Sequence, residues 1–193
     1  MEWVPFGSVD STTLRWLRVG ETPLAFHLLA GDQPLGALQW NEPGGTRATA
    51  TTNAAAWTLK RVGFLNPRVT VRVEGSDANA AQLTVHLNYH RVDLADGGSY
   101  RFHRAGVLLP AWKVYRESGE EILHVEPVRE GRKLAGGAVI APAAATRLPE
   151  FALLVVLSWY FIALAWFEDE AIASLEAPDS APAGAGAGPR AAR

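Results

Sequence analysis

Apolar and polar residues alternate in short runs between residues 14 and 140. The clearest runs are 69–74 and 82–90, in which every second residue is apolar. This period places one face of a strand in a core and the other in solvent, which is typical of antiparallel sheet. Turn-forming sequences such as Asp96-Gly97 and Glu130-Gly131 separate the runs. The pattern predicts about ten to twelve strands, which are enough to close a barrel.

A long apolar segment near the C-terminus breaks this alternation. Residues 151–167 (FALLVVLSWYFIALAWF) carry no formal charge and show no polar face. A helix that is apolar on all sides must be enclosed by protein or by lipid. Pro149 suits a first helical turn, and Glu150 is placed favourably for the helix dipole. We therefore predict a helix over about residues 149–176.

Two environments are open to this helix. Its 17 apolar residues would span about 25 Å, slightly less than a bilayer core of about 30 Å, so it could anchor the chain in a membrane. However, Trp159 and Tyr160 lie in the middle of the segment, whereas membrane helices concentrate these residues at the two interfaces. The strands also need an apolar element to cover their inner face. The pattern favours a core helix and leaves a C-terminal membrane anchor, attached to a cytoplasmic β domain, as the alternative.

The predicted fold class is therefore mainly β: a closed antiparallel barrel of about ten to twelve strands around a hydrophobic C-terminal helix. A chain of 193 residues fits one domain, which we place at residues 1–176. Residues 177–193 are mostly Ala, Gly and Pro, and we expect a disordered tail there. The absence of cysteine excludes disulfides and thiolate catalysis. Because the N-terminus shows no secretory pattern, we expect a cytoplasmic protein, either free in the cytosol or peripherally associated with a membrane.

The order of these elements resembles the tubby C-terminal-like superfamily. The resemblance depends on short strands with tryptophan-containing hairpins, followed by the helix segments LPEFALL (148–154) and LSWY (157–160), and it covers about residues 22–172. This group also contains phospholipid scramblases and LURP-one-related proteins, and the chain looks like a bacterial-type member. The resemblance implies a closed barrel of roughly twelve strands around a hydrophobic helix.

What the resemblance implies for function is narrower. Eukaryotic tubby domains bind phosphoinositides through basic residues on the barrel exterior, and this chain has no residue-for-residue match to that site. The calcium loops and acylated cysteines of the scramblases are also missing from the sequence. The resemblance therefore implies a binding or scaffold role rather than lipid transport.

His86 and His90 are the first candidates for metal ligands. On a helix, residues four apart face each other, but the alternation around these histidines predicts a strand. Four strand residues span about 13 Å, which is too far for one ion. We expect two outward, solvated histidines.

Other candidate chemical groups are few. His124 and Glu126 share a predicted strand face, but an exposed pair of this kind usually has no chemical role. Asp93 and Asp96 precede a Gly-Gly pair and predict a turn, because the alternating ligands of a calcium loop are absent. We predict no catalytic residue, no metal site and no cofactor.

Basic residues form the one functional constellation. Residues 57–133 carry 12 basic and 9 acidic side chains, although the whole chain has a net charge of -2. Several basic residues alternate with apolar ones and are therefore expected to project outward, where phosphate groups could meet them. The alternative is an ordinary solvated barrel face, since acidic residues are mixed into the same stretch. The candidate ligand-binding residues are Lys60, Arg61, Arg68, Arg72, Arg101 and Arg104.

The sequence thus predicts a non-enzymatic binding or scaffold module of the tubby-like type. Its expected partner is an anionic phospholipid surface or another protein. No nucleic acid is expected, because the net charge of -2 gives the molecule no overall attraction for a polyanion.

Overall fold

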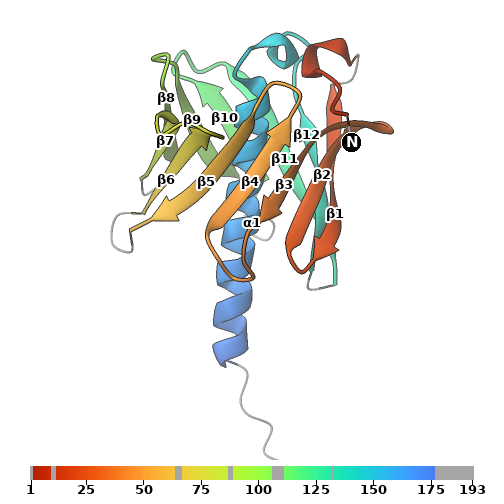
Figure 1. Ribbon diagram of the computed structural model, residues 1–193, viewed down its shortest axis with the longest axis vertical. Coiled ribbons are helices and arrows are strands. Elements are labelled where there is room, and N and C mark those ends of the chain that lie inside the picture. Colours follow the sequence, from red (N-terminus) through yellow and green to blue (C-terminus); the bar gives the residue numbers. More distant parts are fainter. Residues whose placement is uncertain are drawn as a thin grey trace, which may run out of the picture.

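A closed antiparallel barrel surrounds one long helix in the computed structural model (Figure 1). The structure describes residues 2–9, 12–63, 67–86, 89–105, 111–131 and 133–176, and for 168–176 it describes the backbone alone. Twelve strands are found in this described part, at the upper end of the predicted number. The predicted fold class is confirmed.

The strands follow one another around the barrel in chain order, and β1 pairs with β12 to close the sheet. Each pairing is antiparallel, as hairpin connections require. The strands are β1 (Thr13–Glu21), β2 (Leu24–Ala30), β3 (Gln33–Trp40), β4 (Arg47–Thr52), β5 (Ala56–Val62), β6 (Arg68–Val73), β7 (Asn79–Val85), β8 (His90–Leu94), β9 (Ser99–Ala105), β10 (Ala111–Arg116), β11 (Glu121–Glu130) and β12 (Lys133–Ile140). Two short 3-10 helices, η1 (Phe6–Ser8) and η2 (Ala145–Arg147), precede β1 and the long helix α1 (Phe151–Glu176), respectively.

Burial alternates along the strands as the sequence pattern predicts. In β6, Val69 and Val71 are buried, whereas the intervening Thr70 faces outward. The prediction for 82–90 is wrong in one respect, because β7 ends at Val85 and β8 begins at His90. A connection between two strands therefore replaces one continuous strand, and residues 87 and 88 lie outside the described part.

Helix α1 begins at one end of the barrel, runs through its centre and passes out at the other end (Figure 1). The Glu150 carbonyl accepts the first helical hydrogen bond from the Leu154 N–H at 3.0 Å, so Glu150 acts as the N-cap. Pro149 therefore lies before the helix and not in its first turn. Every side chain from residue 151 to 163 is buried. We call the end near residue 167, where α1 passes out, the helix-exit end.

Aromatic rings connect the helix to the barrel wall. The Trp159 ring stacks on Trp16 of β1, with the centroids 5.7 Å apart and the planes at 11°. The next residue, Tyr160, stacks on Trp40 of β3 at 5.7 Å, and its hydroxyl donates a hydrogen bond to the backbone carbonyl of Thr46. Trp159 and Tyr160, at the midpoint of the apolar segment, thus pack against two different strands of the wall.

Gly137 of β12 leaves the space that the Trp159 ring occupies. A Cβ atom at this position would lie 2.6 Å from the Cζ3 atom of Trp159 and 2.6 Å from the backbone oxygen of Glu126. Real Cβ atoms do not approach other atoms so closely, so the ring could not keep its present place. The wall is therefore shaped for the helix at this point.

Of the two environments open to the apolar segment, the structure has the core helix, because its side chains pack against the inner face of the barrel. None of the helices in the described part of the chain combines the length and the apolar character that crossing a bilayer needs. The predicted disordered tail at 177–193 lies outside the described residues.

Replacing Gly137 by Ala tests this packing. The added methyl group must displace Trp159 or the neighbouring strand, and overpacking of this kind costs about 1–3 kcal/mol. We expect the free energy of unfolding, measured by urea denaturation, to fall by that amount.

Gly7→Ala is the matched control, because a Cβ atom there would meet nothing within 4 Å. Its effect should stay within about 0.5 kcal/mol, as for other open surface positions. Equal stabilities of the two variants would contradict the close approach of Trp159 to β12.

Candidate functional site

The six predicted basic residues separate into two groups. Lys60, Arg68, Arg72 and Arg101 occupy outward positions on β5, β6 and β9. The other two, Arg61 and Arg104, share the inward positions of the strands. The strand pairing decides which of them meet.

Three of the outward residues surround Thr70 on β6. Lys60 of β5 lies directly opposite Thr70, and Arg68 and Arg72 flank it on its own strand. Opposite residues lie about 5 Å apart across a sheet, and residues two apart on one strand lie about 7 Å apart. We call Lys60, Arg68 and Arg72 the basic face.

The charges of the basic face have no acidic counterpart at close range. Arg72 donates a hydrogen bond from Nε to the Asn79 Oδ1 atom at 3.2 Å, which is a neutral partner. Within the described part of the chain, Lys60, Arg68 and Arg72 form no ion pair. The three positive charges are therefore available to an external anion.

Arg101 lies further around the barrel. Its direct neighbour across the sheet is Arg91 of β8, and Arg91 in turn faces Thr84, which faces Arg68. Arg91 is paired with Asp93 at 2.8 Å, and Arg101 lies over the Tyr89 ring at 5.8 Å. Two strands thus separate Arg101 from the basic face. Sequence reasoning missed Arg91, although its alternation with the buried Val92 marks an outward position.

Arg61 and Arg104 do not project from the outer wall as expected. Arg61 follows the inward positions Trp57 and Leu59, and Arg104 follows the inward positions Tyr100 and Phe102. Both therefore turn toward the barrel axis at the helix-exit end, where a long side chain can reach solvent past the last turn of the strand. In the sequence, both arginines already fall on the apolar side of the twofold alternation, so the prediction of an outward position was wrong for them.

These two arginines line one cavity of about 300 Å³ between the wall and α1. Tyr89, His90 and Trp112 contribute to its wall. On another part of the same end, the guanidinium of Arg129 lies over the ring of Trp166 at 4.4 Å. The helix-exit end thus combines cationic and aromatic side chains from several strands.

His90 contradicts the expectation of two solvated histidines. Its ring packs 4.9 Å from Trp112 and 5.4 Å from Phe161 of α1, and its Nδ1 atom has no hydrogen-bond partner among the described residues. Burial lowers the pKa of His90, the backbone carbonyl of Tyr89 opposes this shift, and the charge of His86 adds to it. His90 is therefore a neutral wall residue near pH 7, whereas His86 is exposed. Over the described ranges, no three His, Asp or Glu side chains form a metal-binding group.

The remaining polar candidates have local roles. The Asp96 carboxylate accepts a hydrogen bond from the Gly98 N–H at 3.0 Å, which confirms its place in a turn. Asp93 instead holds Arg91 and the Ser99 hydroxyl at 2.8 and 2.9 Å. His124 and Glu126 lie on the outer wall, with 3.5 Å between Nε2 and Oε1.

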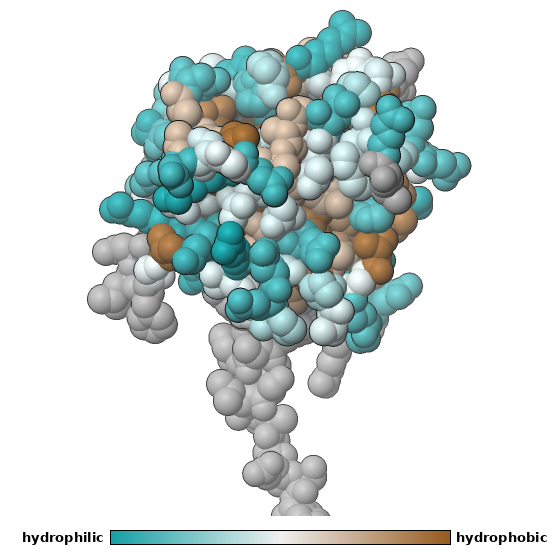
Figure 2. Space-filling model, in the orientation of Figure 1, coloured by the Kyte–Doolittle hydropathy of each residue, from teal (hydrophilic) through white to brown (hydrophobic). Residues whose placement is uncertain are grey.

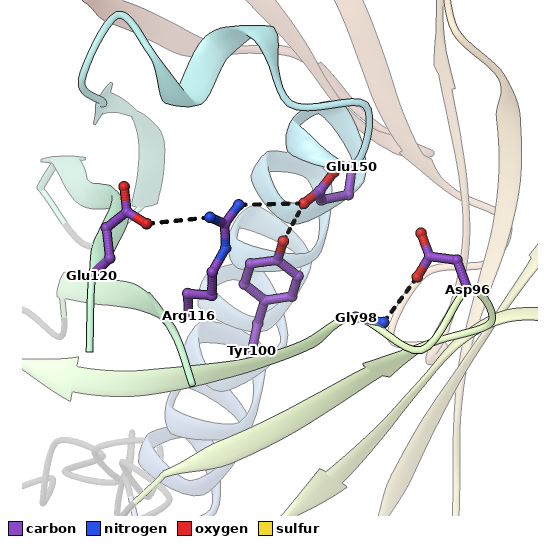
Figure 3. Close-up of polar contacts among 6 residues, drawn as sticks. All are labelled: Asp96, Gly98, Tyr100, Arg116, Glu120 and Glu150. Carbon is purple, nitrogen blue, oxygen red and sulfur yellow. Dashed lines mark hydrogen bonds and ion pairs between the residues drawn. The ribbon is translucent and has the colours of Figure 1, made fainter. Parts of the chain in front are cut away.

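A polar cluster joins α1 to the wall at the end where the helix begins (Figure 3). The Tyr100 hydroxyl donates a hydrogen bond to the Glu150 carboxylate, and an Arg116 nitrogen lies 3.8 Å from the same oxygen. Arg116 also pairs with Glu120 at 3.2 Å. Burial, together with the hydrogen bond to Glu150, raises the pKa of Tyr100 to about 12. The cluster fixes the start of the helix, which is a structural role.

A trough of about 670 Å³ lies over β1, β11 and β12. The β12 residues that line it are all small: Ala135, Gly136, Gly137 and Ala138. Its charged rim is partly neutralised, since Lys133 pairs with Glu21 at 2.6 Å. None of the predicted anion-binding residues lies here.

Comparison with protein-family models, with curated proteins and with solved structures finds no match for the chain. The tubby-like resemblance therefore stays a prediction.

Alkaline unfolding tests the cluster at the start of the helix. Because the pKa of Tyr100 is raised from 10.0 to about 12, its contribution to stability is complete below pH 10 and is lost as the pH rises to 12. We expect the melting temperature of the parent protein to fall over this range, and that of Tyr100→Phe to fall less.

Tyr89→Phe is the control, because the Tyr89 hydroxyl makes no hydrogen bond to any described residue. Its pH dependence should match that of the parent. Parallel curves for the parent and Tyr100→Phe would show that the Tyr100 hydroxyl does not keep its proton preferentially in the folded state.

Proposed function

We propose that the chain is a non-enzymatic binding module of the tubby-like type that contacts anionic phospholipid surfaces from the cytoplasmic side. The basic face of β5 and β6 makes this contact. The observation that carries the proposal is the convergence of Lys60, Arg68 and Arg72 around Thr70, without an acidic partner among the described residues.

The polarity of the surface supports a contact through the side wall of the barrel. Hydrophilic residues cover much of the face that carries β4–β6, with hydrophobic residues in small separate patches (Figure 2). The helix-exit end is less suitable, because α1 protrudes from it and its sequence continues with Glu168, Asp169 and Glu170. An anionic membrane would repel this acidic segment.

The occupied interior supports a binding role over a catalytic one. The apolar side chains of residues 151–163 fill the centre of the barrel, so a substrate could enter only at the ends. A rigid wall that presents fixed cations is suited to recognising phosphate groups, which accept charge-assisted hydrogen bonds from arginine and lysine.

Vesicle binding tests the proposal. We expect the protein to sediment with vesicles of phosphatidylcholine and phosphatidylserine, and to remain in solution with phosphatidylcholine alone. Each basic residue near an anionic surface contributes about 1 kcal/mol, so the triple variant Lys60→Gln, Arg68→Gln, Arg72→Gln should bind at least about tenfold more weakly. High salt should weaken binding by the parent protein.

The matched control removes the same charge from the opposite wall. β1 and β12 lie five and six strands from β6 around the barrel, so Arg15→Gln, Arg18→Gln, Lys133→Gln should leave most of the binding intact. An equal loss in both triple variants would show that no particular face is used. Equal binding to neutral and anionic vesicles, or none at low salt, would contradict the lipid proposal and favour a protein partner.

A further inference from the structure

We propose that the cavity at the helix-exit end binds a small amphipathic anion: one carboxylate, sulfonate or phosphate group on an aromatic or short aliphatic body. The site lies between the inner wall and α1, away from the outward basic face. It is therefore independent of the lipid contact proposed above, and either proposal can fail without the other.

Aromatic side chains form the apolar part of this cavity. His90, Trp112 and Phe161 pack against one another with centroids 4.9 to 6.0 Å apart, and all three line the cavity. Trp112 and Phe161 are 4% and 7% exposed, so they form a fixed surface. A planar or branched apolar group that enters here would have both of its faces removed from water, which favours binding.

The same wall has unused hydrogen-bonding capacity. Trp112 Nε1 is buried and has no partner among the residues that the structure describes, and His90 Nδ1 is buried with the Tyr89 backbone carbonyl close to the ring. Buried polar atoms without a partner are rare in folded proteins. The Nε1 atoms of Trp16, Trp40 and Trp159 are in the same state elsewhere in the barrel, so the assignment of the site rests on the cavity, its aromatic lining and Arg104.

A positive charge lies at the opening of the cavity. Arg104 is exposed, lines the cavity and forms no ion pair with any described residue. Arg61 lines it from β5 and makes contacts of its own, so the inference depends on the charge of Arg104. Because His90 is neutral near pH 7, it adds no second charge to the apolar wall.

The cavity volume limits the size of the ligand. At about 300 Å³, it lies at the lower end of the roughly 300–1,000 Å³ that small-molecule pockets occupy. A body of about two or three fused or linked rings has a volume of this order. The aromatic wall and the charge of Arg104 together define the ligand class.

Fluorescence of 8-anilinonaphthalene-1-sulfonate tests the site in the full chain. This probe carries one sulfonate on linked aromatic rings, and N-phenyl-1-naphthylamine is its neutral counterpart. We expect saturable binding of one sulfonate probe per chain, with at least about tenfold weaker binding of the neutral probe. Near-UV circular dichroism should confirm that the protein is natively packed, since this probe also binds partly unfolded states.

Two variants separate the contributions of charge and space. Arg104→Gln should weaken binding of the sulfonate about tenfold and leave the neutral probe unchanged. Val85→Trp places a large ring at a residue that lines the cavity and is 37% exposed, so it should abolish binding of both probes. Ile140→Trp is the matched control, because Ile140 is similarly exposed at 42% and does not line the cavity.

The inference is overturned if the folded parent shows no saturable binding of the sulfonate, or binds both probes equally. Unchanged binding in Arg104→Gln would also overturn it, and this variant changes an exposed residue that does not endanger folding. The basic-face variant Lys60→Gln, Arg68→Gln, Arg72→Gln should retain sulfonate binding, which keeps this test separate from the vesicle experiment.

Discussion

The contact between the Trp159 ring, Trp16 and the bare backbone at Gly137 sets the geometry on which the rest of the structure depends. A closed sheet has no edge to absorb a misfit, so its interior must be filled by a body of matching width. Helix α1 supplies that body, and the wall provides a space at Gly137 where the widest side chain meets it. The strand pairing that places the charged residues follows from this closure.

This arrangement assigns function to the surface and to the ends of the barrel. The interior holds few polar groups, and the Tyr160 hydroxyl and the Ser158 hydroxyl bond to nearby backbone carbonyls. The outward positions of β5 and β6 carry cations, and the inward positions at the helix-exit end carry Arg61 and Arg104. One alternation along the strands thus produces two distinct cationic regions.

The sequence predicts the barrel and the helix because both have strong periodic signals. An uninterrupted apolar segment and twofold alternation are properties of the chain itself. The strand break after Val85 escaped this reasoning, since the polar residues of the connection continue the alternation of the strand. The grouping of Lys60 with Arg68 depends on strand register, and the contact of Tyr100 with Glu150 joins residues 50 positions apart. Such contacts follow from closure of the barrel, which a local pattern does not describe.

Thiol accessibility of the helix tests the central claim most directly, because the chain contains no cysteine of its own. Ala163→Cys places a thiol on α1 at a fully buried position, and Val19→Cys places one at a position that is 52% exposed. In the folded protein, we expect a maleimide to modify the thiol of Ala163→Cys at least about a hundredfold more slowly than the thiol of Val19→Cys. In denaturant, we expect the two rates to be equal. Equal rates in the folded protein, with unchanged near-UV circular dichroism, would contradict a helix enclosed by the barrel.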